Sequence, residues 1–233
     1  HLAANSDIQA SAENPCVELQ NTYMTTYNLL ECMRKYGVKK MFFASTSAIY
    51  GDNQGISTDE QSELAPISYY GAAKMGAEAL ISAYSFMNDF SSLIFRFPNV
   101  VGPRLTHGVV YDFVGKLKKN PNILEILGDG KQAKPYMLVS DLIDGIMQFS
   151  DTPSGVTTYN IGVDTQTNVT TIADIVCDVM DVKPEYAYTG GKCGWKGDVP
   201  VFAYNLDKIH KAGWYAKHTS DQAIEITVKS ICK

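Results

Sequence analysis

The 233-residue sequence predicts an α/β fold built around a parallel β-sheet. Amphipathic segments alternate with short apolar segments, such as 39–44 and 92–97, which are typical of strands covered on both faces. This alternation is the pattern of the crossover units that build parallel sheets. The composition, with 45% hydrophobic and 19% charged residues, is that of a globular protein with a sizeable core. The length allows one domain, or one domain with a small lobe.

The first half of the chain has the most regular pattern. Apolar residues recur at three- and four-residue spacing from Pro15 to Tyr36, and Gly37 follows the basic pair Arg34-Lys35, where a helix is expected to end. In chain order we expect a helix over 15–36, a strand over 39–44, a loop over 51–66, a helix over 68–90 and a strand over 92–97.

The pattern loosens after Pro98. Here the sequence predicts a helix over 111–119, strands over 124–127 and 136–139, a helix over 141–149, a strand over 159–162 and a helix over 171–180. The N-cap of the last helix is expected to be Thr170 or Thr171. A Gly/Pro-rich loop is predicted over 189–200.

Charge and hydropathy argue against several classes of protein. The net charge of −5 and the pI near 5.4 argue against a binder of nucleic acid or of anionic membranes, which needs a basic face. No run approaches the ~18 apolar residues of a membrane span, and no secretion signal stands at the front. We therefore expect a soluble, cytoplasmic protein with neither nucleic-acid nor membrane partners.

The cysteines and histidines suggest no disulfide framework and no metal site. The five cysteines are odd in number, far apart and without a CxxC pair, so reduced and mostly buried thiols are expected. His107, His210 and His218 lack a second ligand at nearby spacing, so no metal is expected. The chain begins at His1 rather than at a methionine and runs directly into apolar sequence, so a preceding segment is expected.

Tyr70 and Lys74 are the first pair that could carry chemistry. Side chains four residues apart share one face of a helix, so the Lys74 ammonium can lie near the Tyr70 phenol and lower its pKa toward working pH. A phenol with a lowered pKa is a general base for an alcohol. Taken alone, the pair is more often a chance arrangement on a solvated helix face.

Three hydroxyls, Ser45, Thr46 and Ser47, follow the apolar strand 39–44. Ligands of open α/β sheets bind beyond the carboxyl ends of the strands, so a hydroxyl there can hydrogen-bond a substrate. A turn that satisfies its own backbone is the other interpretation. The order of features favours the first, because a Tyr-x-x-x-Lys helix start and a second strand follow.

In this arrangement the sequence resembles the extended short-chain dehydrogenases/reductases, in particular the NAD-dependent nucleotide-sugar epimerase/dehydratase group and its UDP-glucose 4-epimerase-like branch. The blocks that carry the resemblance are His1–Ala4, Ser45–Gly51, Tyr70 with Lys74, Arg96–Arg104, Gly128–Gln132 and Gly197–Pro200. The resemblance implies a Rossmann-like sheet that lacks its first strands, with a strand at 2–4, and a smaller C-terminal α/β substrate-binding lobe.

The resemblance also implies residue roles. Tyr70 would be the base, Lys74 its electrostatic partner and the holder of the cofactor ribose, and Thr46 the hydroxyl donor to the substrate, with Ser45 and Ser47 as fallbacks. The residues implied to contact NAD are Ala3, Ala4, Ser45, Tyr70, Lys74, Phe97 and Pro98. The residues implied to contact the nucleotide sugar, a UDP-hexose, are Ser47, Asn99, Arg104, Lys134, Lys196 and Phe202.

The resemblance further implies that 1–104 belong to the NAD-binding domain, with 137–163 returning to it, and that 105–233 form mainly the substrate-binding lobe. A homodimer is expected through the helices 15–36 and 68–90. The family's GxxGxxG turn would lie ahead of His1. The same glycine spacing occurs at Gly191, Gly194 and Gly197, but no helix is predicted after it. This segment is therefore expected to be a loop on the substrate side.

Two positions depart from the family pattern. Arginines expected on the substrate diphosphate are replaced by Ala133 or Lys134 and by Cys193, and lysine does not reproduce the paired hydrogen bonds of a guanidinium. Three functions remain open: a nucleotide-sugar 4-epimerase, a 4,6-dehydratase, and a non-catalytic homologue that only binds a nucleotide sugar or dimerises. Dehydration is disfavoured because Ser47-Ala48 stands where that branch has an Asp-Glu pair.

Overall fold

The computed structural model describes residues 1–5, 8–53, 57–149, 154–191 and 199–233. The chain divides into two compact units. The N-terminal unit comprises His1–Asn53, Thr58–Phe97 and Ile146–Ile161, and the C-terminal unit comprises 54–57, Pro98–Gly145 and Gly162–Lys233.

The N-terminal unit contains a three-stranded parallel sheet, which confirms the predicted fold class. The strand order is β1 (Lys40–Thr46), β3 (Ser91–Phe97) and β8 (Gly155–Asn160). The strand predicted over 159–162 begins earlier than expected, because Gly155 to Asn160 pair with Ser91 to Arg96 of β3.

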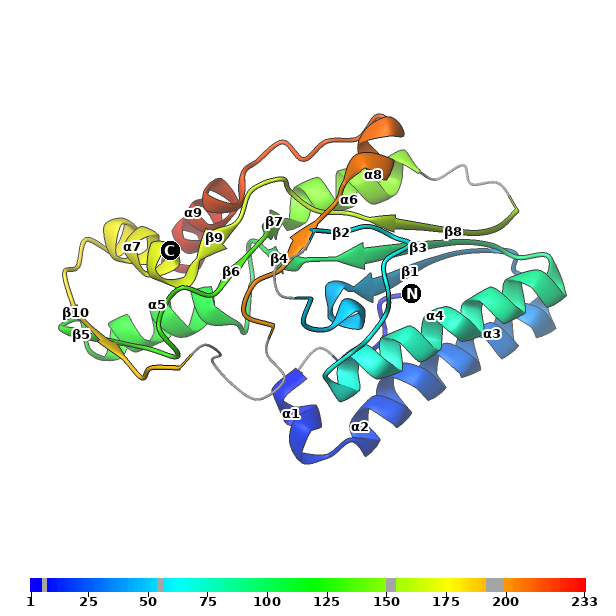
Figure 1. Cartoon of the computed structure of the whole chain (residues 1–233), viewed down its shortest axis with the longest axis horizontal. Coiled ribbons are helices and arrows are strands. Elements are labelled where there is room, and N and C mark those ends of the chain that lie inside the picture. Colours follow the sequence, from blue (N-terminus) through cyan, green and yellow to red (C-terminus); the bar gives the residue numbers. More distant parts are fainter. Residues whose placement is uncertain (6–7, 54–56, 150–153, 192–198) are drawn as a thin grey trace. The chain divides into compact units, whose positions relative to one another are not determined.

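Helices cover one face of this sheet. The predicted helix 15–36 is present as α2 (Cys16–Glu18), the π-helix η1 (Leu19–Met24) and α3 (Thr25–Tyr36), with Gly37 in the left-handed region at its end. The helix predicted over 68–90 is α4 (Tyr69–Asn88), which lies beside α3 along the sheet (Figure 1). The short elements of this unit are α1 (Ile8–Glu13) and the 3-10 helix η2 (Ser47–Tyr50).

The core of the N-terminal unit lies between these helices and the sheet. Its buried side chains are Leu30, Met33, Met41, Phe43, Ala77, Ile81, Phe90 and Ile94. Because α3, α4, β1 and β3 all contribute to this core, burial of apolar area fixes α4 against the two strands.

The C-terminal unit is mixed α/β, and its strands pair in twos. β4 (Asn99–Val101) pairs in parallel with β7 (Tyr136–Leu138), β5 (Ile123–Ile126) in parallel with β10 (Glu185–Tyr188), and β6 (Ala133–Lys134) antiparallel with β9 (Thr167–Asn168). Its longer helices are α5 (Val109–Lys119), α7 (Val169–Met180) and α9 (Ser220–Ile231), which pack around one apolar core. This unit also contains β11 (Ala203–Tyr204) and α8 (Asp207–Lys211), while β2 (Ser57–Thr58) and α6 (Val139–Gln148) each span the boundary between the two units.

Three sequence-based expectations about local structure are wrong. Residues 2–4 form no strand; the segment connects to β1 through His1, whose carbonyl accepts from Ala44 N at 3.3 Å. The N-cap of α7 is Asn168, whose side chain accepts from Thr171 N at 2.8 Å, because its amide oxygen reaches the first turn that Thr170 and Thr171 already occupy.

The third wrong expectation concerns the thiols, which are not mostly buried. Cys16 and Cys32 are exposed on the N-terminal helices, Cys177 is buried and Cys232 is partly buried. Across the described ranges, no helix is long and apolar enough to cross a membrane. Among the same residues, no group of three or more His, Cys, Asp or Glu side chains could hold a metal ion.

Candidate active site

β1 and α4 bring the predicted catalytic side chains of the N-terminal unit to one place. β1 ends at Thr46, and α4 begins directly after Ser68, whose hydroxyl accepts from Gly71 N at 3.1 Å as the N-cap. A Cβ on Gly71 would lie 2.5 Å from the carbonyl oxygen of Ala48 in η2. Glycine therefore allows the first turn of α4 to approach the end of β1 this closely.

Across this contact the Thr46 side chain is close enough to the Tyr70 phenol to influence its pKa. Thr46 Oγ1 also accepts from Ala48 N at 3.2 Å, which fixes the orientation of its hydroxyl at the strand end. Burial raises the pKa of Tyr70 to about 12, while the Thr46 side chain acts in the opposite direction and the charge of Glu18 adds to the rise. The phenol is therefore protonated at neutral pH in this structure.

Lys74 lies one helical turn beyond Tyr70 and is only 4% exposed. Its Nζ donates to the carbonyl oxygen of Ala44 at 2.7 Å and lies 5.9 Å from the centre of the Tyr70 ring. Burial lowers the pKa of Lys74 to about 8, and the charges of Glu18 and Glu78 oppose that decrease. The ammonium therefore predominates at neutral pH.

The predicted lowering of the Tyr70 pKa by Lys74 is wrong for this structure. The Lys74 ammonium donates to a backbone carbonyl of β1, and burial of the phenol is the largest influence on its pKa. The predicted placement on one helix face, with Nζ beside the Tyr70 ring, is what the structure has.

Ser45 and Ser47, the alternatives to Thr46 as hydroxyl donor, lie in different surroundings. Ser45 is buried and donates to Glu78 Oε1 of α4, so its hydroxyl is already used inside the protein. Ser47 is partly buried and is the first residue of η2. Of the two, Ser47 is better placed to meet a ligand beyond the end of β1.

The other residues of this unit that were predicted to contact NAD are Phe97, at the end of β3, and Ala3 and Ala4, in the segment before α1. Phe97 ends β3 and is the register partner of Thr46, so the two strands end at the same level. Ala3 is exposed and Ala4 is partly buried, in the segment that His1 connects to β1.

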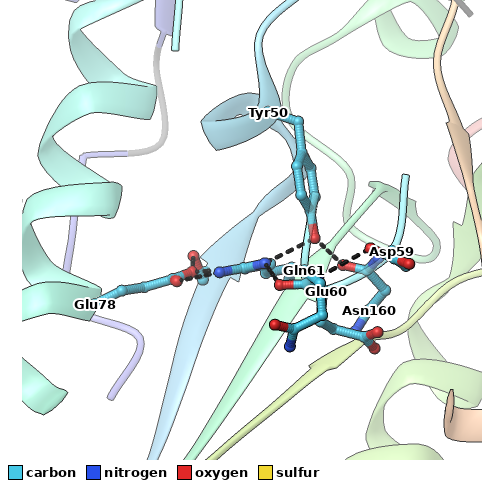
Figure 2. Close-up of polar contacts among 8 residues, drawn as sticks. Tyr50, Asp59, Glu60, Gln61, Glu78 and Asn160 are labelled. Carbon is cyan, nitrogen blue, oxygen red and sulfur yellow. Dashed lines mark hydrogen bonds and ion pairs between the residues drawn. The ribbon is translucent and has the colours of Figure 1, made fainter. Parts of the chain in front are cut away.

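A buried polar network behind Tyr70 and Lys74 was missed by the sequence reasoning. Arg96 of β3 forms paired hydrogen bonds with Glu78 of α4, with Nε to Oε1 at 3.2 Å and Nη2 to Oε2 at 2.7 Å. Figure 2 shows Glu78 on one side of this network and Tyr50 and Asn160 on the other. Arginine inside an otherwise apolar buried strand was the available signal, since a buried charge requires a partner.

In the C-terminal unit, the structure describes most of the predicted substrate-binding residues. Pro98 is buried, Asn99 is exposed at the start of β4, and Arg104 is exposed with a φ of 66° in the turn that follows. These three residues lie within one short segment.

A second group in this unit comprises Lys134 and Phe202. Phe202 N donates to the carbonyl oxygen of Ala133 at 3.2 Å, which places the buried Phe202 ring next to the strand that carries Lys134. Lys196, Cys193 and most of the Gly191–Gly197 loop lie outside the described residues.

Comparison with known proteins identifies the family. The model of the NAD dependent epimerase/dehydratase family matches residues 1–162. The chain is 29% identical over 231 residues to the UDP-glucuronate 4-epimerase of Thermodesulfobacterium geofontis, covering 98% of this chain and 70% of that protein.

Solved structures agree with this match. A crystal structure of UDP-galactose 4-epimerase superposes with a TM-score of 0.90 at 35% identity, covering 100% of this chain and 76% of that one. The UDP-glucose 4-epimerase of Thermus thermophilus, in complex with NAD, has a TM-score of 0.87 at 29% identity with the same coverage. With its parallel sheet, its Thr46–Tyr70–Lys74 arrangement and these matches, the chain belongs to the NAD-dependent epimerase/dehydratase family.

Proposed function

We propose that this chain carries the catalytic residues of an NAD-dependent nucleotide-sugar 4-epimerase that acts on a UDP-hexose of the UDP-glucose/UDP-galactose type. The observation that carries the proposal is the Lys74 ammonium 5.9 Å from the centre of the Tyr70 ring, on a helix whose first turn lies against the residues that follow Thr46. This arrangement places a hydroxyl, a phenol and a cation at the carboxyl edge of a parallel sheet, where open α/β folds bind their ligands.

In this proposal each side chain has a separate role. Tyr70 takes the proton of the sugar C4 hydroxyl and later returns it, and Thr46 hydrogen-bonds the same oxygen. Because burial keeps the phenol protonated at rest, proton removal depends on its ionised fraction, which a nearby positive charge increases. When bound, NAD supplies the acceptor for the hydrogen on C4.

The donors around Lys74 fit the ribose of a dinucleotide. An ammonium has three N–H donors, and the hydrogen bond to Ala44 O accounts for one of them. Lys74 and Tyr70 together would hold the ribose hydroxyls, with Ala3, Ala4, Ser45, Phe97 and Pro98 beside the cofactor.

The C-terminal unit supplies most of the proposed contacts to the nucleotide sugar. Asn99 and Arg104 follow β3 within one segment, and Lys134 lies next to Phe202. Arginine and lysine attract the diphosphate, and an apolar ring suits the uracil base. In this assignment 1–104 with 137–163 serve mainly the cofactor, while Thr46, Ser47, Asn99 and Arg104 within them contact the nucleotide sugar. The segment 105–233, including Lys196, serves mainly the substrate.

Dehydration is the second activity within the same family, and the turn after Thr46 does not favour it. η2 has the sequence Ser-Ala-Ile-Tyr and contains no carboxylic acid to assist the loss of water. The epimerase assignment needs no acid at that point, because the phenol both removes and returns the proton.

The deciding experiment compares Tyr70→Phe with the parent protein, using UDP-glucose and UDP-galactose as substrates in the presence of NAD. Removing the phenol oxygen while keeping the ring should lower kcat by roughly 10²–10⁴-fold, the usual loss for a positioned acid/base. Binding of the nucleotide sugar, measured by calorimetry, should survive.

Tyr69→Phe is the matched control. Tyr69 is the neighbouring tyrosine on α4 and is 53% exposed, so losing its hydroxyl should leave kcat unchanged. A parent protein that converts neither UDP-sugar would overturn the epimerase proposal. Conversion that survives Tyr70→Phe would instead overturn the role of Tyr70 alone.

We also propose that the functional protein is a homodimer formed through α3 and α4. Leu19 of η1 is 53% exposed, and Phe86 near the end of α4 is 86% exposed. Apolar side chains left in water on two adjacent helices are typical of a surface that a second copy covers.

A further inference from the structure

The ion pair between Glu78 and Arg96 is a buried contact of the N-terminal unit that is made by two hydrogen bonds. Arg96 is 5% and Glu78 is 7% exposed, and two N–H groups of the guanidinium meet both carboxylate oxygens. Two parallel hydrogen bonds fix the relative orientation of the two planar groups, which a single contact does not. The pair therefore orients α4 relative to β3.

Further hydrogen bonds connect Arg96 to the rest of the sheet edge. Arg96 Nη1 donates to Tyr50 Oη at 2.8 Å and to the carbonyl oxygen of Glu60 at 3.2 Å. Tyr50 Oη donates to Asn160 Oδ1 at 2.7 Å, and Asn160 N donates to Glu60 Oε1 at 2.7 Å (Figure 2). The guanidinium is thus held by residues of η2 and of the segment before α4, and Tyr50 and Glu60 in turn connect it to Asn160 of β8.

The network forms one layer across the sheet. Ser45, Arg96 and Asn160 are register partners on β1, β3 and β8, and Ser45 donates to Glu78. The next residue along β1 is Thr46, the proposed partner of the substrate oxygen. The polar layer therefore lies directly beneath the last residues of the strands, which carry the proposed chemistry.

On the helix, Glu78 continues the face that carries the catalytic pair. Tyr70, Lys74 and Glu78 follow at four-residue spacing, so they occupy one face of α4. The ionisable groups around Lys74 are Tyr70 and Glu78 on the same helix, Glu18 on α2 and the amino group of His1 beside β1. Glu78 is the carboxylate of this set that is itself fixed by a guanidinium.

We propose that Glu78 and Arg96 are positioning residues for the Tyr70–Lys74 pair: the ion pair anchors the reactive face of α4 to the strand ends and holds an anion one helical turn behind Lys74. The proposal deepens the epimerase function, since it rests on Tyr70 and Lys74 being the catalytic residues. The charge of Glu78 favours the Lys74 ammonium, in agreement with its effect on the pKa of that amine.

The electrostatic part of the proposal is tested without catalysis. The protein is labelled with [ε-13C]lysine, the Lys74 resonance is assigned from its loss in Lys74→Met, and its pH titration is followed by NMR. Glu78→Gln should lower the pKa of Lys74 by about 1, the size expected for a nearby opposite charge. Arg96→Met, which leaves the carboxylate, should not lower it.

Because an unpaired buried charge can prevent folding, the double variant Glu78→Gln/Arg96→Met is included. It buries neither charge, so it should regain much of the stability that either single variant loses. The pKa of Lys74 should still fall in the double variant, because the anion behind Lys74 is gone. An unchanged Lys74 pKa in both Glu78→Gln and the double variant would contradict the electrostatic part of the proposal, whatever the enzyme's activity.

The geometric part is tested by Arg96→Lys, which keeps the positive charge and removes the paired hydrogen bonds. We expect kcat for the UDP-sugar to fall between about 10- and 100-fold with little change in KM, because misplacement of Tyr70 affects the reaction more than binding. Full kcat in Arg96→Lys would contradict the positioning role, whereas inactivity of the parent protein would contradict the epimerase function.

Ser85→Ala is the matched control for both parts. Ser85 Oγ and Ser92 Oγ lie 2.8 Å apart and form another buried contact between α4 and β3, without charge. Its loss should leave both the Lys74 pKa and kcat unchanged. An equal effect of Ser85→Ala would show that loss of any contact between α4 and β3 changes the Lys74 pKa and kcat. That result would contradict a specific role of the ion pair.

Discussion

At the residue scale, the pKa of Lys74 results from opposing effects of burial and of nearby carboxylates. Burial favours its neutral form, while Glu18 and Glu78 favour the ammonium, and the net result is a pKa of about 8. An unfolded lysine has a pKa near 10.4, so the unfolded chain binds the Lys74 proton more tightly than the folded chain does. Stability contributed by this residue is therefore complete above the unfolded pKa and is lost as the pH falls through about 8.

This balance predicts how Lys74→Met changes the pH dependence of unfolding. Between pH 7 and 10, the parent protein should gain about 2 to 3 kcal/mol of stability that the variant does not gain, because methionine has no proton to lose. Urea unfolding of both proteins at several pH values measures the difference, and subtraction cancels the titration of the other lysines and tyrosines. Parallel curves for the two proteins would contradict the lowered pKa of Lys74.

At the scale of elements, the residues at the N-terminus of α4 determine the position of its first turn. The Ser68 cap satisfies Gly71 N, and the missing side chain of Gly71 lets the helix approach η2. Tyr70 lies between these two residues, so the contact between α4 and η2 also determines the distance from the phenol to Thr46. The apolar core beneath α3 and α4 then fixes the rest of the helix.

Gly71→Ala tests this arrangement. The new Cβ would lie 2.5 Å from Ala48 O, so the helix must shift, and we expect a loss of roughly 1–3 kcal/mol of stability together with weaker activity. Gly115→Ala in α5 is the comparison, because a Cβ there meets nothing within 4 Å and should raise stability by up to about 1 kcal/mol. Equal effects of the two substitutions on urea unfolding would refute the close approach at Gly71.

At the scale of the whole molecule, the chain forms two compact units, and each has its own apolar core. The larger exposed apolar side chains of the N-terminal unit include several on the helical layer. Leu19 and Tyr27 lie on the η1–α3 segment at 53% and 38% exposure. Two turns separate them along the helix, so they can contribute to one continuous surface.

The proposed homodimer predicts a mass of twice 25.6 kDa for the chain in sedimentation experiments at micromolar concentration. The double variant Leu19→Glu/Tyr27→Glu should sediment as a monomer, because burying two carboxylates in an apolar interface costs more than the contact gains. Ile143→Glu, on the exposed face of α6 at 50% exposure, should leave the mass unchanged. A monomeric parent protein would end the dimer proposal.

The sequence by itself determined the features that depend on near neighbours. Apolar spacing and a terminal glycine predicted α3, the apolar runs predicted β1 and β3, and four-residue spacing put Tyr70 and Lys74 on one face. These interactions join residues a few positions apart, so a local pattern is sufficient to predict them.

Only the tertiary structure decided which distant groups meet. Tyr50 and Asn160 are 110 positions apart, and nothing in their local sequence indicates that they join one hydrogen-bond network with Arg96. The pKa of Tyr70 likewise depends on burial by the surrounding chain, which reversed the shift expected from Lys74 alone. Burial and long-range hydrogen bonds arise from the packing of the whole unit, because many different partners are compatible with the same local pattern.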